Sequence, residues 1–419
     1  MTQEIIKLLD SNNKKYKHYA YLPSLEEFNS YHHGTYNLFK TNKSIEERFL
    51  FSAKDIFNTY DFPTQMGSPQ WKGFNAGNNA RVISDLLNVG DRLVGKTTTS
   101  EFAVHEETDV INPWDEKRTV GTSSAGAPIS ILIDKLDFAL GTQTGGSIGR
   151  PASYCGVSAI KPTYGLIPRT GILKTCDPFD TVGFFSKNLN IMEKVLKSVV
   201  KIGNNYPINN REISNNIAKE KPIVGILSSN KLEISPEADN KLSEIKSSLD
   251  PSQFDVVDVT FPEFVNEIHK MHELIYAYSL SYYFSKELEH PEKVSASFKN
   301  YIKIGELLKA DDFIDLIKKH EDYISKYDDW IKSKNIDYII YPSTANVAPL
   351  RNDIEPIDIN LIYTFTRVPV IYLPLGFNKT KSLPFGISIS SFKYNDFNLI
   401  NFSKDFEKSF INNEGNSPI

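Results

Sequence analysis

The sequence predicts a mixed α/β protein in which a mixed, twisted β-sheet is sandwiched between layers of α-helices. First, buried-strand runs alternate with amphipathic helical patterns along the chain. Second, a strand–helix–strand unit, which is typical of parallel pairing, is predicted by the consecutive segments PIVGIL, PEADNKLSEIKSSL and FDVVDVTF. Third, VPVIYLPLGF and LPFGISIS predict two partner strands near the C-terminus. With 419 residues and 40% hydrophobic composition, the chain can bury such a core.

Residues 1–48 are expected to form an N-terminal helical segment that packs on the core. FLFSAKDI (49–56) follows as a short buried strand, with the unusual feature of a lysine, Lys54. AGNNARVISDLLNVG (76–90) then places its apolar residues on one helical face, and RLVGKT (92–97) predicts the next strand.

The C-terminal part continues the same alternation. Residues 262–334 predict long helices, and DYIIYP (337–342) predicts a buried strand. A closing amphipathic helix carries Leu399, Phe402, Phe406 and Phe410. Because neither a repeat nor a long flexible linker interrupts the chain, we expect residues 49–419 to form a single α/β/α domain.

The composition excludes several classes of function. Forty-seven Lys and Arg against 52 Asp and Glu give a net charge of −5, with the basic residues scattered, so nucleic-acid binding is not expected. The sequence contains no run of 18 apolar residues, so it predicts no membrane span. Cys155 and Cys176 cannot form a disulfide framework or a four-cysteine zinc site. We expect a cytoplasmic protein with no metal or other cofactor.

GDRLVGKT (90–97) matches the phosphate-binding loop pattern G-x-x-x-x-G-K-[ST]. That loop needs a strand before its first glycine and a helix after its threonine. Here a helix precedes the motif and the motif itself predicts a strand, so we favour a helix-to-strand turn over a nucleotide site.

GGSIG (145–149) matches the nucleophile elbow of α/β-hydrolases, with Ser147 as the attacking residue. The elbow should open into a helix, where Pro151 is tolerated only in the first turn. The histidines that could act as its base, His269, His272, His290 and His320, lie in helical, charged surroundings. His269, His272 and Glu273 also share a helix face, which we interpret as a polar surface and not as a metal site.

A group of four residues lies in the parts of the chain that are richest in small residues: Lys54, Ser123, Ser124 and Ser147. Serine is a weak nucleophile, and a lysine can take its proton if burial lowers the pKa of the lysine toward neutrality. The backbone amides of TGGS can converge on one point, because glycine allows unusual dihedral angles, and so stabilise an oxyanion.

These residues carry a resemblance to a known family. GTSSAGAPISI (121–131) and DFALGTQTGGSIGRPASYCGVSAIKPTYGLIPRTG (137–171) resemble the defining block of the amidase signature family, which are serine hydrolases with a Ser-Ser-Lys triad. The 24 residues between Ser123 and Ser147 match the family's separation. FSAKDIFNTYDFPTQMGSPQWKGF (51–74) is similar to the segment that carries the catalytic lysine. The resemblance runs from about Phe49 nearly to the end.

The resemblance implies roles for individual residues. Ser147 is similar to the nucleophile, Ser123 to the bridging serine that follows a cis peptide, and Lys54 to the base. The oxyanion hole would be formed by the amides of Thr144, Gly145, Gly146 and Ser147. Ser124, Arg150 and Asp180 are candidates for supporting or substrate-binding residues. Arg150 is expected either to anchor a substrate carboxylate or to pair with an acid such as Asp180. Gln143 stands where many family members have Asp, and Thr122 and Ala125 replace glycines.

The implied activity is hydrolysis of a small linear carboxamide to a carboxylic acid and ammonia or an amine through an acyl-enzyme. Two alternatives stay open: a glutaminase (A-type) subunit of a tRNA-dependent amidotransferase, and an α/β-hydrolase-type esterase that uses Ser147 with a histidine base. The expected partner is a small-molecule amide, and a homodimer is compatible with the sequence.

Overall fold

A computed structural model describes residues 3–34, 48–201, 219–228, 234–351, 353, 358–378 and 383–411. Residues 35–47 of the predicted N-terminal segment and 412–419 at the C-terminus lie outside the described residues.

Within the described residues, eleven strands form one sheet in the order β1-β3-β2-β4-β6-β5-β10-β11-β9-β7-β8. The strands are β1 (Tyr19–Tyr21), β2 (Leu50–Lys54), β3 (Arg92–Thr97), β4 (Phe138–Gln143), β5 (Ser158–Lys161), β6 (Thr181–Ser186), β7 (Ile223–Leu227), β8 (Asp255–Val259), β9 (Tyr338–Pro342), β10 (Val370–Asn378) and β11 (Leu383–Ser391). β2 is parallel to β3 and β4, and β7 is parallel to β8 and β9. The pairings from β4 to β9 are antiparallel, so the sheet is mixed as predicted.

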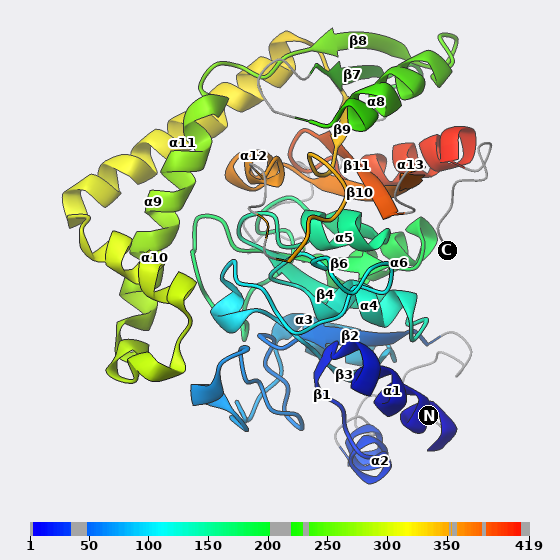
Figure 1. Cartoon of the computed structure of the whole chain (residues 1–419). Helices are drawn as coiled ribbons and strands as arrows, with labels where there is room; N and C mark the ends of the chain where they lie inside the picture. The colour runs from blue at the N-terminus through cyan, green and yellow to red at the C-terminus, as the bar shows by residue number, and fades with distance from the viewer. Residues whose placement is uncertain are drawn as a thin grey trace.

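The helices form two layers and a long lateral group (Figure 1). They are α1 (Gln3–Tyr16), α2 (Leu25–Gly34), α3 (Arg81–Asn88), α4 (Gly126–Leu132), α5 (Gly149–Cys155), α6 (Leu189–Val199), α8 (Pro236–Ser248), α9 (Val265–Phe284), α10 (Ala296–Glu306), α11 (Ala310–Ser333), α12 (Asn360–Phe365) and α13 (Asp396–Phe406). α4 and α5 pack on the central strands, and α3, α6 and α13 form a second group against the sheet. α9, α10 and α11 stand along one side of the molecule, at the left of Figure 1.

The core of the protein lies in the middle of the sheet. Every residue of β4, β6 and β11 is buried, which requires cover on both faces because successive side chains point to opposite sides. Phe51 of β2 stacks on Phe138 of β4, with ring centroids 4.9 Å apart. The predicted fold class, a mixed sheet between helical layers, is therefore confirmed.

The predicted strand–helix–strand unit is also confirmed. β7 and β8 pair in parallel, and α8 connects them. Pro236 begins the helix, where its missing N–H costs nothing. The hydroxyl of Ser235 accepts a hydrogen bond from the amide of Ala238 at 3.2 Å, which caps the first turn.

The N-terminal segment contains a strand as well as helices. β1 pairs antiparallel with β3 at the edge of the sheet, with Tyr19 opposite Thr97. The buried carboxylate of Asp134 contacts His18 at 2.7 Å and the hydroxyl of Tyr19 at 2.8 Å. A three-residue strand is too short to show alternating hydrophobicity, so the sequence pattern did not reveal it.

The GDRLVGKT motif is a helix-to-strand turn, as interpreted from the sequence. α3 precedes it, and RLVGKT forms β3. Lys96 is fully buried, forms an ion pair with Asp55 at 3.1 Å and donates to the carbonyl of Pro63 at 3.0 Å. This lysine binds groups of its own chain and does not face a phosphate site.

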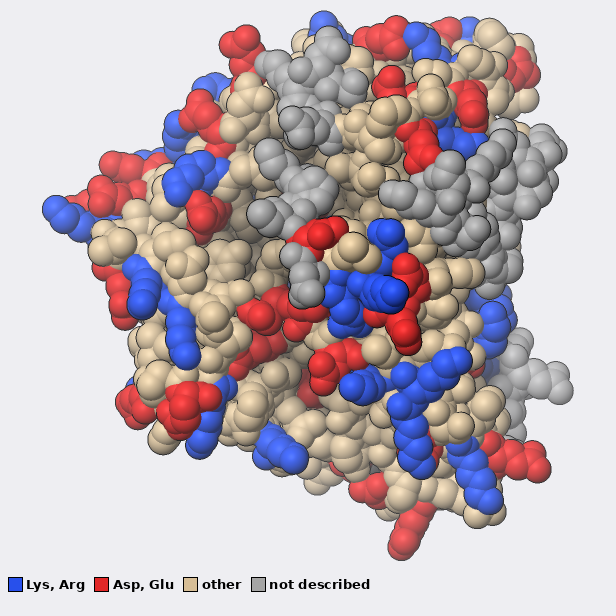
Figure 2. Space-filling model, in the orientation of Figure 1, with Lys and Arg blue, Asp and Glu red and all other residues tan. Residues whose placement is uncertain are grey.

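The surface agrees with the nearly balanced composition. Figure 2 shows acidic and basic side chains intermingled over the viewed face, separated by uncharged surface. Within the described residues, no helix combines the length and apolar character needed to cross a bilayer.

Candidate active site

Three segments that are distant in sequence meet beside the C-terminal ends of β2 and β4. Lys54 is the last residue of β2, and Ser147 lies in the turn between β4 and α5. Ser123 lies just before α4. Because β2 and β4 are parallel neighbours, their C-terminal ends open on the same edge of the sheet. This pairing brings the lysine and the two serines together.

A line of hydrogen bonds connects the three side chains. The Nζ atom of Lys54 lies 2.7 Å from the Oγ atom of Ser123, and the hydroxyl of Ser123 donates to the Oγ atom of Ser147 at 3.1 Å. Lys54 also donates to the hydroxyl of Thr142 at 3.1 Å. The peptide bond between Thr122 and Ser123 is cis. The residues therefore have the geometry of a proton relay that ends at Ser147.

Burial sets the protonation of Lys54. Its side chain is 0% exposed, and the loss of hydration lowers its pKa from 10.5 to about 7, although the negative charge of Asp180 acts in the opposite direction. A substantial fraction of Lys54 is thus neutral near pH 7 and carries a lone pair that can accept a proton.

Ser147 faces a cavity of about 500 Å³. Lys54 and Ser123 are not among its lining residues, so these two side chains lie behind the hydroxyl of Ser147 as seen from the cavity. The described lining residues are Ala103, His105, Thr144, Gly145, Gly146, Ser147, Arg150, His269, Lys270, His272, Glu273, Tyr276, Tyr301, Asp358 and Leu361. A cavity of this size accommodates a small organic substrate.

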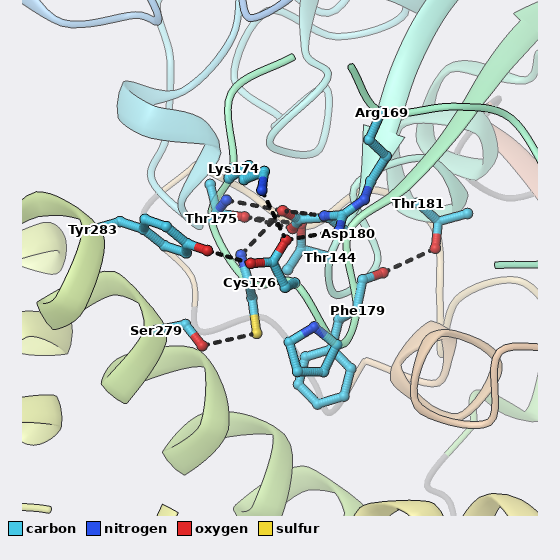
Figure 3. A network of polar contacts seen from close by, with 12 residues as sticks. Thr144, Arg169, Lys174, Thr175, Cys176, Phe179, Asp180, Thr181, Ser279 and Tyr283 are labelled. Atoms are coloured by element: carbon cyan, nitrogen blue, oxygen red, sulfur yellow. Dashed lines mark hydrogen bonds and ion pairs between the residues drawn. The ribbon is translucent and has the colours of Figure 1, made fainter. Parts of the chain in front are cut away.

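The loop that ends at Ser147 begins with Thr144, and Thr144 belongs to a network of polar contacts centred on Asp180 (Figure 3). The hydroxyl of Thr144 donates to Oδ1 of Asp180 at 2.7 Å. Oδ2 of Asp180 accepts from the amide of Thr175 at 2.9 Å and from the guanidinium of Arg169 at 3.2 Å. Figure 3 shows Asp180 in the middle of these donors. Asp180 therefore supports the loop and does not line the cavity.

Gln143 occupies the position where a family resemblance suggested Asp. Its side-chain oxygen accepts hydrogen bonds from the amides of Ile148 and Gly149, both at 3.0 Å. These amides begin α5, so the neutral amide side chain satisfies two of the donors at the start of this helix. Pro151 is in the first turn of α5, where proline is tolerated, and a helix does follow Ser147.

Arg150 is held by several groups of the chain. Its Nη1 atom donates to Asp358 at 2.8 Å, and its Nη2 atom donates to the carbonyl of Thr122 at 3.0 Å and lies 3.2 Å from Nδ1 of His105. An acid such as Asp180 was a candidate partner from the sequence, but the structure places Asp358 there and pairs Asp180 with Arg169. Ser124 donates to the carbonyl of Thr142 and supports β4.

The four histidines considered as a base for Ser147 do not contact its hydroxyl. Among the described residues, none of the four is hydrogen-bonded to Ser147. The Nε2 atom of His272 contacts the carbonyl of Thr144 at 2.6 Å, and that of His320 contacts the carbonyl of Phe365 at 2.8 Å. His290 is exposed, and His269 lines the cavity. The described part of the chain also contains no cluster of three or more His, Cys, Asp or Glu side chains suited to a metal.

Sequence reasoning missed three residues of this site, Thr142, Asp358 and His105, and it named His272 only as a candidate base or as part of a polar helix face. Thr142 could have been found, because it precedes Ser147 on the strand that leads to it. His105 and Asp358 stand in segments with no motif, and His272 faces the site only because α9 packs against the loop. Tertiary packing alone places these three residues at the site.

Comparison with known proteins agrees with this geometry. The amidase family model matches residues 49–400. The A-type subunits of the glutamyl-tRNA(Gln) amidotransferases from Thermoanaerobacter pseudethanolicus and Natranaerobius thermophilus are 37% and 40% identical over 153 and 144 residues. These matches cover 35% and 33% of this chain and 31% and 29% of the relatives, so the chain matches about a third of their length.

Solved structures show the same fold over nearly the whole chain. 6-Aminohexanoate cyclic dimer hydrolase in complex with substrate has a TM-score of 0.84 at 19% identity, with 97% of this chain and 92% of that chain covered. The A-type glutamyl-tRNA(Gln) amidotransferase chain from Thermotoga maritima has a TM-score of 0.76 at 21% identity, covering 97% and 89%. From the family match, the fold and the arrangement of residues around Ser147, we conclude that this chain belongs to the amidase family.

Proposed function

We propose that this protein hydrolyses a small carboxamide, with Ser147 as the nucleophile, Ser123 as the bridging serine and Lys54 as the base. The observation that carries the proposal is the continuous line of contacts from the Nζ atom of Lys54 through Ser123 to the Oγ atom of Ser147. Serine needs such a base, because its hydroxyl is a weak nucleophile at neutral pH.

Acylation begins with the neutral form of Lys54. As the Oγ atom of Ser147 bonds to the substrate carbonyl carbon, its proton passes to Ser123, and the proton of Ser123 passes to Lys54. The carbonyl π electrons move to oxygen and form an oxyanion. The tetrahedral intermediate collapses when the carbon–nitrogen bond breaks, and the nitrogen receives the proton that returns from Lys54 through Ser123. Ammonia or an amine leaves, and the acyl group remains on Ser147.

Water completes the reaction by the same path in reverse. It attacks the acyl carbon, gives a proton to the relay, and the carbon–oxygen bond to Ser147 breaks as that serine regains its proton. The products are a carboxylic acid and the free enzyme. Atoms and protons balance in these steps without a cofactor.

The loop Thr144–Ser147 is suited to hold the oxyanion. The amide N–H groups of Gly145, Gly146 and Ser147 have no hydrogen-bond acceptor among the described residues, and all three residues line the cavity. Amides that are already directed at the developing charge stabilise it without reorganisation, and loss of one such donor in an enzyme costs about 10²–10³ in kcat.

A second candidate function comes from the names of the relatives. A glutaminase subunit of an amidotransferase would use the same three residues but pass ammonia to a partner. The curated relatives with 37–40% identity carry that name. Co-purification of a second subunit, together with glutamine-specific ammonia release, would favour it. The esterase alternative with a histidine base is not supported, because Ser147 is hydrogen-bonded to Ser123 and, among the described residues, to none of the four histidines.

The test uses an activity-based probe and a panel of amides. A fluorophosphonate should label the wild-type chain at Ser147, and ammonia release should be detected with at least one small amide. Ser147→Ala should abolish both while leaving the melting temperature nearly unchanged, because the side chain loses only a hydroxyl. Labelling at a different serine, or labelling that persists in Ser147→Ala, would disprove the assignment.

A further inference from the structure

Each carbonyl of the loop that precedes Ser147 is held by a donor. The carbonyl of Thr144 accepts from Nε2 of His272 at 2.6 Å, and the carbonyl of Gly145 accepts from the hydroxyl of Thr364 at 2.6 Å. The carbonyl of Gly146 accepts from the amide of Arg150 at 3.0 Å, as α5 begins. Only the third of these bonds comes from the backbone.

Holding a carbonyl also directs the next amide. In a trans peptide the C=O and N–H groups point in opposite directions, and the described residues contain no cis peptide in this loop. The donor on the carbonyl of Thr144 therefore turns the N–H of Gly145 away from α9. The donor on the carbonyl of Gly145 turns the N–H of Gly146 away from α12. These are the amides assigned above to the oxyanion.

The two glycines cannot hold this orientation by themselves. Glycine has no Cβ atom and populates more of φ/ψ space than any other residue, so a Gly-Gly pair needs outside contacts to stay in one conformation. A larger residue does not fit at the second position, because a Cβ atom on Gly146 would lie 1.9 Å from the carboxylate of Asp358. The loop thus needs glycine for space at position 146 and depends on its neighbours for rigidity.

We propose that His272 and Thr364 are positioning residues, which hold the Thr144 and Gly145 carbonyls so that the following amides face the oxyanion. This inference rests on the proposed hydrolysis at Ser147. Neither residue lies next to the signature block in sequence: His272 belongs to α9 and Thr364 to α12.

His272 is built to act as a fixed neutral donor. Its ring stacks on Phe179 with centroids 4.5 Å apart, and it lies parallel to Tyr276 at 5.8 Å. Burial lowers its pKa to about 4, so the ring is neutral at physiological pH. A carbonyl oxygen can only accept, so Nε2 carries the hydrogen and cannot at the same time act as a base or bind a metal.

Thr364 is oriented by the residue before the loop. Nε2 of Gln143 donates to its hydroxyl at 3.0 Å, which leaves the hydroxyl hydrogen for the carbonyl of Gly145. The oxygen of the same Gln143 side chain accepts from two amides at the start of α5. One buried glutamine therefore joins Thr364 to both ends of the turn that carries Ser147.

The experiment measures the second-order rate of fluorophosphonate labelling, because the phosphonyl oxygen gains charge at the place of the oxyanion. The donor-removing variants are His272→Phe, which keeps a ring to stack on Phe179, and Thr364→Val, which keeps the shape. His272→Gln and Thr364→Ser each retain a donor. Where an amide substrate is found, kcat and KM are measured for the same set.

His320→Phe is the matched control. His320 is also a buried histidine with a pKa lowered to about 4, and its Nε2 atom also donates to a backbone carbonyl, that of Phe365 at 2.8 Å. Its ring also packs on Phe179, edge-on at 5.0 Å. It differs from His272 in that the carbonyl belongs to the end of α12 and not to the loop.

We expect His272→Phe and Thr364→Val each to slow labelling and kcat by about 10–100-fold, since a small misplacement of catalytic groups has effects of this size. KM should change little. His272→Gln and Thr364→Ser should recover most of the rate. His320→Phe should lower the melting temperature about as much as His272→Phe and leave labelling within a few-fold of wild type.

The outcomes separate this inference from the proposed function. If wild-type Ser147 is labelled but His272→Phe and His320→Phe label at the same rate, the positioning role of His272 is wrong. If His272→Phe does not fold, Thr364→Val against Thr364→Ser decides, and equal rates for that pair overturn the inference. If wild-type Ser147 is not labelled at all, the proposed function fails and the positioning roles fail with it.

Discussion

The acid limb of the pH–rate profile should shift to lower pH when Asp180 is changed to Asn. Two opposing effects set the pKa of Lys54 at about 7: burial lowers it, and the negative charge of Asp180 raises it. Asparagine has the same shape without the charge, so the burial effect remains unopposed by this residue. The lysine in Asp180→Asn should therefore lose its proton at a lower pH than in the wild type.

The wild-type pKa gives the size of the effect. With a pKa of about 7, roughly a tenth of Lys54 is neutral at pH 6 and roughly nine tenths at pH 8, so kcat/KM should rise about tenfold over this range. A pKa one unit lower would reduce this ratio to about twofold. The plateau at high pH should also fall, because an amide in place of the carboxylate cannot accept all the bonds that Thr144 and its neighbours donate to Asp180.

The assay is ammonia release or fluorophosphonate labelling from pH 5 to 9, with the midpoint of the acid limb as the readout and thermal melts as a check on folding. Asp177→Asn is the matched control. Asp177 belongs to the same network and also binds Arg169, but its charge is not a cause of the shift in the pKa of Lys54. A midpoint that stays constant or rises in Asp180→Asn, a wild-type rate that is flat between pH 6 and 8, or an active Lys54→Arg enzyme would refute the reasoning.

Three further predictions concern the buried side chains of Lys54, Arg150 and Lys96. The pKa of Lys54 is about 7 in the folded chain and 10.5 for a fully hydrated lysine. Between these pH values the unfolded chain binds more protons than the folded chain, so folding stability rises with pH. Urea unfolding should therefore show Lys54→Met to be more stable than wild type near pH 7, with a smaller gain near pH 10. Arg150→Lys should lower kcat about tenfold with little change in KM for neutral amides, because lysine cannot contact Asp358 and the carbonyl of Thr122 as a planar fork does; a rise in KM confined to carboxylate-bearing substrates would contradict this. Lys96→Met should destabilise the fold by about 3–5 kcal/mol, because it leaves Asp55 buried without its cation. Because Lys96 binds groups of its own chain, ATP should not raise the melting temperature of the wild type. A rise would restore the interpretation of GDRLVGKT as a nucleotide-binding loop.

Sequence patterns predicted most of the fold for a simple physical reason. Strands and helices bury one or both faces, and burial leaves a period of two or 3.6 residues, or a continuous apolar run, in the chain itself. Three predicted strands are present in the structure: those of FLFSAKDI, RLVGKT and VPVIYLPLGF. The apolar face predicted for residues 76–90 is the buried side of α3 and includes Val82, Leu86 and Leu87. The short strand β1 was missed because three residues carry no period.

The site was predictable where residues are close in sequence. Ser123, Ser147 and the glycines of the loop fall within one small-residue block, and Lys54 stood out as a charge at the end of an apolar strand. The partner of Arg150 was not predictable: Asp358 is 208 residues away and belongs to no motif, whereas the nearer Asp180 was an equally suitable acid.

By itself, the sequence determined most of the strands and helices, the family resemblance and the candidates Lys54, Ser123 and Ser147. Only the tertiary structure decided that Lys54 contacts Ser123 at 2.7 Å, and that burial brings the pKa of this lysine to about 7. It alone placed His272 and Thr364 against the loop carbonyls. The reason is that periodicity records which residues are buried, whereas hydrogen-bond partners and desolvation depend on which distant segments the sheet brings together.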